Sequence, residues 1–322
     1  MKLNVIIGNQ YNPYLNLAVE NHLLKKNLKD EITVFLWKNH HTVVIGANQN
    51  PYAECNVQSL IDDGGYLSRR KTGGGAVYHD LGNINFSFIA HKDHYNVNLQ
   101  LSVIKVALLN YGLETEISGR NDLTYEGRKF SGNAFSKDKS NCLHHGTILI
   151  KTDVDKISKY LKVKPTKLMK HGVRSVASRV VNLSEVADIT SENIIPHIIT
   201  AAENVYGTKA NIIDFNAILN QEVYSLEKDF SSEEFLYGRW KSFNAKHSAQ
   251  FSWGAVDIDI SVDETTGTIE NVNIATDSLN LEVIDSLCLS LKGSSSQSRP
   301  SLSIANSDLE TTIVNDILDL IY

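Results

Sequence analysis

The sequence has few cysteines, and the three it has show no pairing pattern. Cys55, Cys142 and Cys288 lie far apart in the chain and are odd in number. A disulfide framework is recognised by an even set of cysteines at regular spacings, so none is predicted here. The cysteine content favours a reducing compartment, and we expect a cytoplasmic protein.

Long apolar runs are also missing. Residues 1–8 hold one short apolar run followed by polar residues, which does not resemble a signal peptide. No apolar stretch approaches the roughly 20 residues that a membrane-spanning helix needs. We therefore expect no membrane segment.

The sequence has no excess of positive charge. It holds 31 Lys and Arg against 37 Asp and Glu, a net charge of -6. Nucleic-acid-binding domains usually carry a basic face, so this balance argues against a nucleic-acid partner. A local basic pocket is compatible with the charge, and it would suit an anionic small ligand or an acidic partner protein.

What is present is the composition of an ordinary globular protein, with 42% hydrophobic and 21% charged residues. A length of 322 residues predicts two or three domains. Strand and helix patterns are mixed. The predicted elements of the first part are a strand at 3–7, a helix starting at Asn12-Pro13, a hairpin of 33–37 and 42–46, a strand at 144–150 and helices at 191–206 and 215–228.

Beyond residue 240 the pattern changes. Strands 251–260 and 268–274 alternate apolar and polar residues, which predicts a hairpin with one wet face. Helices are expected at 281–291 and 307–321. This region is predicted to be a small α+β domain, with its boundary near residues 229–246.

Residues 69–88 are the most informative stretch. Gly73, Gly74 and Gly75 leave the backbone bare, and Arg69 and Arg70 stand just before them. Backbone N–H groups of such a turn can converge on a phosphate or carboxylate, and an arginine fork adds charge-assisted bonds. Glycine clusters in β proteins are also often tight turns or bulges with no ligand. The polar and cationic neighbours favour the anion site.

A second stretch, residues 118–135, contains a predicted tight turn at Glu126-Gly127. The flanking strands would present Asn121, Asp122 and Lys129 from adjacent ends. A lone lysine on a hairpin is usually solvated, but this one is also a candidate phosphate ligand. Both interpretations stay open from the residues alone.

Other candidates are ambiguous by pattern. Glu20 lies close to the apolar stripe of the first helix, where a rim charge is favoured over a group that reaches into a pocket. Trp37 could line a pocket, although core filling is favoured. His91 and His94 have a metal-ligand spacing but no acidic or cysteine partner. The basic segment 162–179 is a solvated linker or a mobile loop that closes over an anion.

Taken together, the residues resemble the lipoate-protein ligase family. The matching motifs, in family order, are Asn16-Leu17-Ala18-Val19-Glu20, Arg69-Arg70, residues 73–83, Gly119-Arg120-Asn121-Asp122, Lys129-Phe130-Ser131-Gly132, His144-His145-Gly146-Thr147, residues 174–183, Phe251-Ser252-Trp253-Gly254 and Thr276-Asp277-Ser278-Leu279-Asn280. Thr72 stands where serine is common in the family, and Tyr78 where phenylalanine is.

The resemblance implies an α+β fold: a large two-sheet catalytic domain of the biotin/lipoate ligase type, residues 1–240, and a small α+β accessory domain, residues 247–322. An adenylate-binding loop would span about 162–183 and shield the intermediate from water. Because relatives without the accessory domain need a separate partner to make the adenylate, autonomous activation is expected here.

The implied reaction has two steps. (R)-lipoate and ATP, with Mg²⁺, give lipoyl-AMP and pyrophosphate, and the lipoyl group then passes to a lysine of an acceptor lipoyl domain. By family analogy the acceptors are acyltransferase subunits of 2-oxoacid dehydrogenases or the glycine-cleavage H protein. A monomer is expected.

The resemblance also assigns roles to residues. Lys129 is the catalytic candidate, and Asp122 is the candidate Mg²⁺ ligand. The ATP and lipoyl-adenylate site is assigned to Arg70, Gly73, Gly74, Gly75, Ala76, Val77, Tyr78, Asn83, Asn121, Asp122, Lys129, Ser131, Arg174, Ser178 and Arg179. The lipoate pocket is assigned to Glu20, Trp37, Arg70, Gly75, His79, Lys129, Ala134 and His145.

One alternative from the same fold is an ATP-independent lipoyl or octanoyl amidotransferase that uses a cysteine nucleophile. Cys142 is the cysteine near the predicted site, and its Cys-x-His spacing suggests this chemistry. Such transferases place the nucleophile in the loop after the His-Gly strand, and residues 151–183 contain no cysteine. The ligase is therefore preferred.

Overall fold

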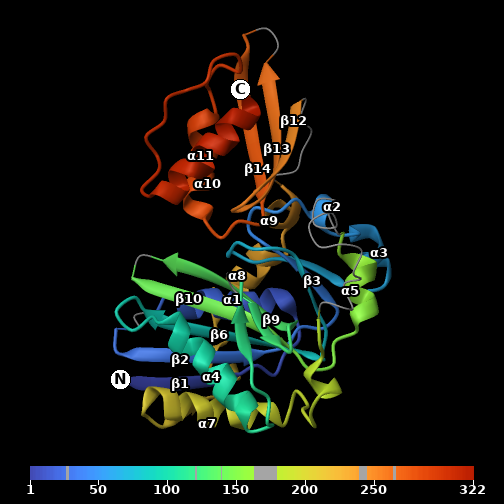
Figure 1. The fold of residues 1–322 in the computed structure, drawn as a ribbon, viewed down its shortest axis with the longest axis vertical. Helices are drawn as coiled ribbons and strands as arrows, with labels where there is room; N and C mark the ends of the chain where they lie inside the picture. Colours follow the sequence, from blue (N-terminus) through green and yellow to red (C-terminus); the bar gives the residue numbers. More distant parts are fainter. Residues whose placement is uncertain (27–28, 120–121, 139, 163–179, 239–244, 264–265) are drawn as a thin grey trace. The chain divides into compact units, whose positions relative to one another are not determined.

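The computed structural model describes residues 1–26, 29–119, 122–138, 140–162, 180–238, 245–263 and 266–322 (Figure 1). These residues form two compact units. Unit 1 comprises Met1–Val44, Cys55–Ser68 and Val77–Ser232, and unit 2 comprises Ile45–Glu54, Arg69–Ala76 and Glu233–Tyr322. Each unit is therefore assembled from segments that are separate in the sequence.

Unit 1 is built on a mixed sheet of eight strands in the order β11-β1-β2-β6-β10-β9-β8-β7. The strands are β1 (Lys2–Ile7), β2 (Glu31–Trp37), β6 (Asn83–His91), β7 (Glu116–Ser118), β8 (Asp122–Tyr125), β9 (Arg128–Asp138), β10 (Asn141–Leu149) and β11 (Ala210–Ile213). β1 runs parallel to β2 and β11, and the remaining pairs are antiparallel.

Helices cover both faces of this sheet (Figure 1). α1 (Pro13–Leu24) packs against β2, β6 and β10 and also against α8 (Gln221–Ser231). α4 (Val97–Leu109) and α7 (Ile194–Tyr206) pack together over the other face. α1 starts as expected, because the side chain of Asn12 accepts the N–H of Tyr14 at 2.9 Å and Pro13 occupies the first turn.

The two faces of the sheet differ in chemistry. Val34, Leu36, Phe86 and Phe88 belong to the apolar core under α4 and α7. Successive residues of a strand point to opposite faces, so Phe35, Trp37, Asn85 and Ser87 face α1. The face under α1 is therefore a mixture of aromatic and polar side chains.

A second sheet, β4-β3-β5, consists of β3 (Thr42–Ile45), β4 (Tyr66–Arg69) and β5 (Val77–His79). The expected hairpin of residues 33–37 and 42–46 is wrong. β2 pairs with β1 and β6, whereas β3 pairs with β5. The connection between them is held by α1, since Asn16 donates to the carbonyl of Lys38 and the amide oxygen of Asn39. It carries the chain from one sheet to the other.

The short helix α2 (Pro51–Glu54) belongs to unit 2. The short helices of unit 1 are α3 (Val57–Asp62), α5 (Val154–Tyr160) and the 3-10 turns η2 (Leu183–Glu185) and η3 (Phe215–Ile218). The helix expected over 215–228 is divided. Leu219 is extended at the end of η3, and Asn220 then caps α8 by accepting the N–H of Val223 at 3.0 Å.

The C-terminal part of unit 2 contains the short helix α9 and a three-stranded antiparallel sheet with two longer helices. Its elements are α9 (Glu233–Tyr237), β12 (Ala245–Phe251), β13 (Gly254–Asp263), β14 (Thr268–Thr276), α10 (Leu281–Leu291) and α11 (Asp308–Ile321). The hairpin of β13 and β14 and both helices are confirmed. The strand expected over 251–260 starts later than predicted, because residues 252–253 form a turn between β12 and β13.

Candidate functional site

A buried polar network occupies the face of the large sheet under α1. Oε1 of Glu20 accepts a hydrogen bond from Oγ of Ser87 at 2.5 Å and lies 2.8 Å from Nδ1 of His145. Nε1 of Trp37 donates to Ser87 Oγ at 2.9 Å. A carboxylate only accepts hydrogen bonds, so Nδ1 of His145 carries the proton. The network joins α1, β2, β6 and β10.

The burial of this network settles two open interpretations. Glu20 is 4% exposed, so it is not the rim charge that the pattern favoured. Two donors surround its carboxylate, which meets the requirement that a buried charge be paired. Trp37, also 4% exposed, is buried as core filling predicts, stacks on Phe35 and places its N–H in the polar network.

A row of residues crosses the sheet on the same face. Asp122 is paired with Gly132, Thr147 with Asn85, and Asn85 with Trp37. The amide of Gly132 donates to Thr147 Oγ1 at 3.2 Å, which links the two halves of the row. The strand register therefore places the Lys129 hairpin at one end of a polar row and the Trp37 network at the other.

Lys129 lies at the outer end of that row. Its Nζ is 2.8 Å from Oδ1 of Asp122, and its side chain is 41% exposed. The Glu126-Gly127 turn that places it is confirmed, with positive φ angles of 49° and 74°. A side chain at Gly132 would meet Lys129 Nζ at 3.1 Å, so the glycine leaves space for the ammonium. The pair offers one cation and one carboxylate.

Two residues of this face were missed by sequence reasoning. Ser87 joins Trp37 to Glu20, and Asn85 stands in the middle of the row. Oδ1 of Asn85 accepts from Nδ2 of Asn83 at 3.0 Å, and its own Nδ2 is buried. The available signal was the polar residue at every second position, 83, 85 and 87, of an otherwise apolar strand.

Other predicted residues lie on β5, β9 and β10. Ala134 is paired with His145 across β9 and β10, so the two side chains share one side of the sheet. His79, on β5, packs edge-on against Trp37 with ring centroids 6.3 Å apart. Tyr78 is buried against His41, and burial raises the pKa of its hydroxyl. Ser131 is buried on the other face of β9 by strand alternation, where Nδ2 of Asn133 donates to its Oγ at 3.4 Å.

Gly73, Gly74 and Gly75, here called the glycine run, belong to unit 2. The guanidinium of Arg70 donates hydrogen bonds to carbonyls of this run. Arg70 Nη2 donates to the carbonyls of Gly73 at 2.7 Å and Gly75 at 2.8 Å, and Nε donates to Thr72 Oγ1 at 3.0 Å. Several of the donors that we expected to meet an anion therefore hold the loop. Val77, Tyr78, His79 and Asn83 are in unit 1, whereas Arg70, Gly73, Gly74, Gly75 and Ala76 are in unit 2.

His144 and Cys142 lie on the other face of β10, by the alternation of the strand. His144 stacks on Phe88, a residue of the core under α4. Burial, and then the neighbouring His145, lower the pKa of His144 from 6.5 to about 3. Burial also raises the pKa of the Cys142 thiol. Neither residue joins the polar network.

Four predicted residues, Asn121, Arg174, Ser178 and Arg179, lie outside the described residues. The described end of the 162–183 loop region approaches Lys129: the N–H of Val181 donates to the carbonyl of Lys129 at 3.0 Å. Among residues described by the structure, no cluster of three or more His, Cys, Asp or Glu could hold a metal. Asp122 therefore stands as a single carboxylate.

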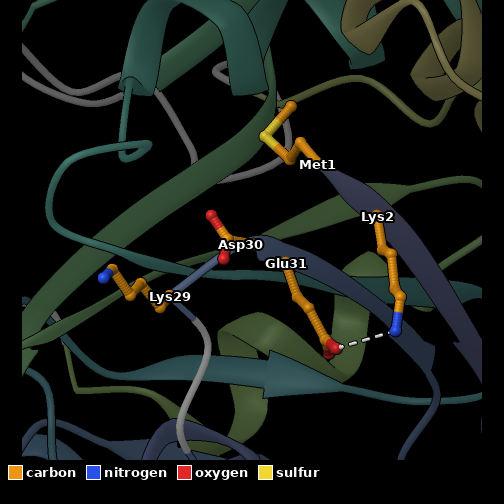
Figure 2. A pocket seen from close by; sticks show the side chains of 5 residues that line it. All are labelled: Met1, Lys2, Lys29, Asp30 and Glu31. Carbon is orange, nitrogen blue, oxygen red and sulfur yellow. Dashed lines mark ion pairs between the residues drawn. The ribbon is translucent and has the colours of Figure 1, made fainter.

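A surface pocket of about 450 Å³ is lined by Met1, Lys2, Lys29, Asp30 and Glu31. Figure 2 shows its ion pair, in which Lys2 Nζ lies 3.7 Å from Glu31 Oε1. It shares no residue with the predicted site. Over the described ranges, no helix has both the length and the apolar character to cross a bilayer.

Comparison with known proteins identifies the class. Residues 12–203 match the lipoyl protein ligase A/B catalytic domain, and residues 241–314 match the bacterial lipoate protein ligase C-terminus. The first match alone covers more than half of the chain. These two matches define a lipoyl ligase with its C-terminal domain, on an α+β fold of the expected kind.

Individual relatives agree. Lipoate-protein ligase A of Bdellovibrio bacteriovorus is 39% identical over 300 residues, covering 91% of this chain and 88% of the relative. The same protein of Psychrobacter cryohalolentis is 36% identical over 300 residues, covering 90% and 88%. The crystal structure of P. falciparum LipL1 in complex with lipoate has a TM-score of 0.84 at 31% identity, covering 98% of this chain and 99% of that one. The chain belongs to the lipoate-protein ligase A family, and it is a lipoate–protein ligase.

Proposed function

We propose that this chain activates lipoate with ATP to lipoyl-AMP and transfers the lipoyl group to a lysine of an acceptor lipoyl domain. The observation that carries the proposal is the polar row across the large sheet, with the Lys129–Asp122 pair at one end and the Trp37–Ser87–Glu20–His145 network at the other. A lipoate carboxylate would lie at the cationic end. Its acyl chain would extend toward Trp37.

The first step forms a bond between a lipoate carboxylate oxygen and the α-phosphorus of ATP, and pyrophosphate leaves with the electrons of the broken P–O bond. Carboxylate and phosphate repel each other, so a cation between them lowers the barrier. Lys129 is the described cation on this face. We assign it to the carboxylate and α-phosphate oxygens.

Asp122 fits a Mg²⁺ ion as one oxygen ligand. Mg²⁺ is commonly held by one or two carboxylates together with substrate phosphates, so a single carboxylate is sufficient. Bound there, the ion would supply further positive charge to the phosphate oxygens. In this proposal, the ion pair with Lys129 keeps the Asp122 carboxylate beside the reacting groups.

The lipoate pocket would be lined by Trp37, His79, Ala134 and His145, with Glu20 holding His145 in position. Strands are about 4.8 Å apart, so the two spacings from β9 to β6 span about 10 Å. This is the length scale of an extended eight-carbon acyl chain. In this assignment, Arg70 and Gly75 border the carboxyl end of lipoate.

The nucleotide part of the proposed site is assigned to Gly73, Gly74, Gly75, Ala76, Val77, Tyr78, Asn83, Asn121 and Ser131, with Arg174, Ser178 and Arg179 of loop 162–183 over the intermediate. Bare glycine backbone allows a phosphate to approach closely. In the same proposal, residues 1–240 bind the substrates and residues 247–322 form the accessory domain.

The second step transfers the acyl group. The acceptor lysine amine forms an amide with the acyl carbon, the acyl–phosphate bond breaks, AMP leaves and the amine loses a proton. An archaeal bipartite lipoate protein ligase from Thermoplasma acidophilum is described with its E2 lipoyl domain, and its fold matches with a TM-score of 0.66 at 24% identity. Acyltransferase subunits of 2-oxoacid dehydrogenases and the glycine-cleavage H protein are the proposed acceptors. A cytoplasmic monomer remains the prediction.

The proposal is tested by incubating the protein with lipoate, ATP and Mg²⁺, with and without an acceptor domain, and measuring products by mass spectrometry. Without acceptor we expect lipoyl-AMP and pyrophosphate. With acceptor we expect AMP and one lipoylated lysine. Lipoylation that proceeds from a lipoylated carrier protein in the absence of ATP would contradict the proposal.

The cysteine-dependent alternative predicts a different response to substitution. Cys142 lies on the face away from Glu20 and His145, and burial raises the pKa of its thiol, which opposes nucleophilic attack. Cys142→Ser should therefore leave ligation within about twofold of the parent, because Ser is nearly isosteric and no step uses the thiol. Loss of transfer in this variant, with stability unchanged, would favour the amidotransferase.

A further inference from the structure

The motif Thr276-Asp277-Ser278-Leu279 has no role in the reaction just described, yet it contacts the glycine run directly. The N–H of Gly74 donates to the carbonyl of Ser278 at 3.3 Å. A side chain at Gly73 would lie 2.3 Å from that carbonyl oxygen and 3.0 Å from Cα of Leu279. Backbone therefore packs on backbone here, and glycine at position 73 is required by this contact.

A third backbone segment completes the contact. The N–H of Thr276 donates to the carbonyl of Asn48 at 3.0 Å, and the N–H of Ala47 donates to the carbonyl of Thr72 at 2.9 Å. A side chain at Gly46 would lie 2.3 Å from the carbonyl oxygen of Gly74. Residues 46–48, 72–74 and 276–279 thus form one closely packed layer, and all of them belong to unit 2.

The turn at 276–279 is fixed by its own side chains. Oδ1 of Asp277 accepts the N–H of Ala255, the second residue of β13, at 2.7 Å. Oγ1 of Thr276 accepts the N–H of Ser278 at 3.0 Å, and Ser278 is completely buried. A carboxylate that accepts a backbone N–H makes a stronger bond than a neutral acceptor. Asp277 therefore anchors the turn to the C-terminal sheet.

Arg69 ties the same layer to α9. Its Nη1 donates to the carbonyls of Ala47 at 2.9 Å and Gln49 at 2.8 Å, and its Nη2 donates to the carbonyl of Leu236 at 2.6 Å. A buried arginine that donates to several backbone carbonyls acts as a structural clamp. The glycine run is thus held by residues that come after position 232 in the chain.

We propose that the turn of residues 276–279 sets the position of the glycine run and that Asp277 is a positioning residue for the activation step. Asp277 acts through Ser278, whose carbonyl receives the Gly74 N–H, and it touches no substrate. Insofar as it concerns activation, this inference rests on the proposed function, in which the run binds the adenylate. The C-terminal region would then take part in activation through backbone contacts.

The first test measures hydrogen exchange at residues 72–76 in the full-length protein without ligands. Asp277→Ala leaves the Ala255 N–H without its acceptor, so we expect exchange at 72–76 to rise about tenfold. Asp277→Asn keeps an acceptor oxygen and should restore most of the protection. Asp316→Ala is the matched control, because it removes a bond of the same 2.7 Å length, to Trp253 Nε1, in the same unit. It should leave residues 72–76 unchanged.

A second pair of variants acts on the run itself. Gly73→Ala places a methyl group against the Ser278 carbonyl, whereas Gly75→Ala points into open space with no atom within 4 Å. We expect faster exchange at residues 276–279 in Gly73→Ala and not in Gly75→Ala. Unchanged exchange at 72–76 in Asp277→Ala, together with unchanged exchange at 276–279 in Gly73→Ala, would overturn the inference.

Activity separates this inference from the proposed function. With Asp277→Ala we expect a higher KM for ATP and lipoate in pyrophosphate release and a smaller change in kcat, with rescue by Asp277→Asn. If the run exchanges faster while adenylate formation stays normal, the positioning inference stands and the run is removed from the proposed adenylate site.

Discussion

Charged residues on the α1 face differ in how far they are exposed to solvent. The carboxylate of Glu20 is buried. The free-energy cost of removing it from water is offset because Ser87 and His145 are both within hydrogen-bond distance of its Oε1. Lys129 is a cation at the half-exposed end of the row, paired to Asp122. The Glu20 carboxylate is buried, whereas the half-exposed Lys129 can exchange its carboxylate partner for substrate oxygens.

Lys129→Ala should lower the rate of adenylate formation by roughly a hundredfold or more, because a positioned electrostatic group is lost from the reacting atoms. Pyrophosphate release from lipoate and ATP measures this step. Lys137→Ala is the control, since Lys137 is an exposed lysine on the same strand, β9. Near-normal release in Lys129→Ala would refute the assigned role.

His144 should make the protein less stable in acid. Its pKa is near 6.5 when unfolded and about 3 when folded, mainly because of burial. Between these values the unfolded chain binds a proton that the folded chain does not. The free energy of unfolding from this group therefore falls as pH drops through the window, by up to about 1.4 kcal/mol per pH unit.

Urea titrations at several pH values between 7 and about 5 measure this slope. His144→Asn should flatten it, whatever its effect on stability at neutral pH. The pKa values of His22 and His41 are also lowered by burial and add slopes of the same sign, so the comparison is variant against parent. Equal slopes in the two proteins would contradict the prediction.

Among the elements, the hairpin β8–β9 determines where Lys129 lies. Its turn requires positive φ at two successive residues, which Gly127 adopts freely and Glu126 does not. Glu126→Asn should raise the free energy of unfolding by about 0.5 kcal/mol or more, because Asn tolerates the left-handed region. Urea denaturation measures the change.

Gly127→Ala in the same turn should have the opposite sign, because φ is 74° at this position. Adenylate formation should stay near the parent value in Glu126→Asn, since the register of the hairpin is unchanged. A destabilised Glu126→Asn protein would show that Glu126 has a contact worth more than the backbone strain.

The local sequence pattern was sufficient to predict the β8–β9 and β13–β14 hairpins. In both, strands that are neighbours in sequence pair with each other, and the turn residues are diagnostic. It was insufficient for residues 33–46, where two strand-like runs look like a hairpin. There the first strand pairs with β1 and β6, and only long-range pairing decides between the alternatives.

For the whole molecule, the division into two units has a thermodynamic consequence. Ligands that bind the folded state stabilise it by about 2.7 kcal/mol at a hundredfold excess over Kd. Substrates that bind Lys129 should protect the core of unit 1 from hydrogen exchange, and substrates that bind Gly73, Gly74 and Gly75 should protect the core of unit 2. The backbone amides of β6 report hydrogen exchange in the core of unit 1, and those of β13 report it in the core of unit 2.

Lipoate with a non-hydrolysable ATP analogue is a suitable ligand pair for this measurement. We expect slower exchange in both strands. Protection confined to β6 would contradict a role of the glycine run in binding, without affecting the assignment of Lys129.

The sequence by itself determined the family, the order of the motifs, the fold class and the identity of Glu20, Trp37, Lys129 and His145 as residues of interest. Motifs and turn residues are local, and they are visible in a single chain. The structure decided which faces these residues share. Strand register places Ser87 opposite His145, and the packing of α1 on the sheet brings Glu20 to both. Alternation along β10 separates His145 from His144, although the two histidines are adjacent in sequence.

The structure also decided what the arginines and glycines of residues 69–75 contact. From the sequence they were predicted to form an anion site. In the fold, Arg69 and Arg70 donate to backbone carbonyls, and Gly73 and Gly74 pack against Ser278, some 200 residues later in the chain. Hydrogen-bond partners are set by distances in space, and no local pattern encodes a contact across that separation.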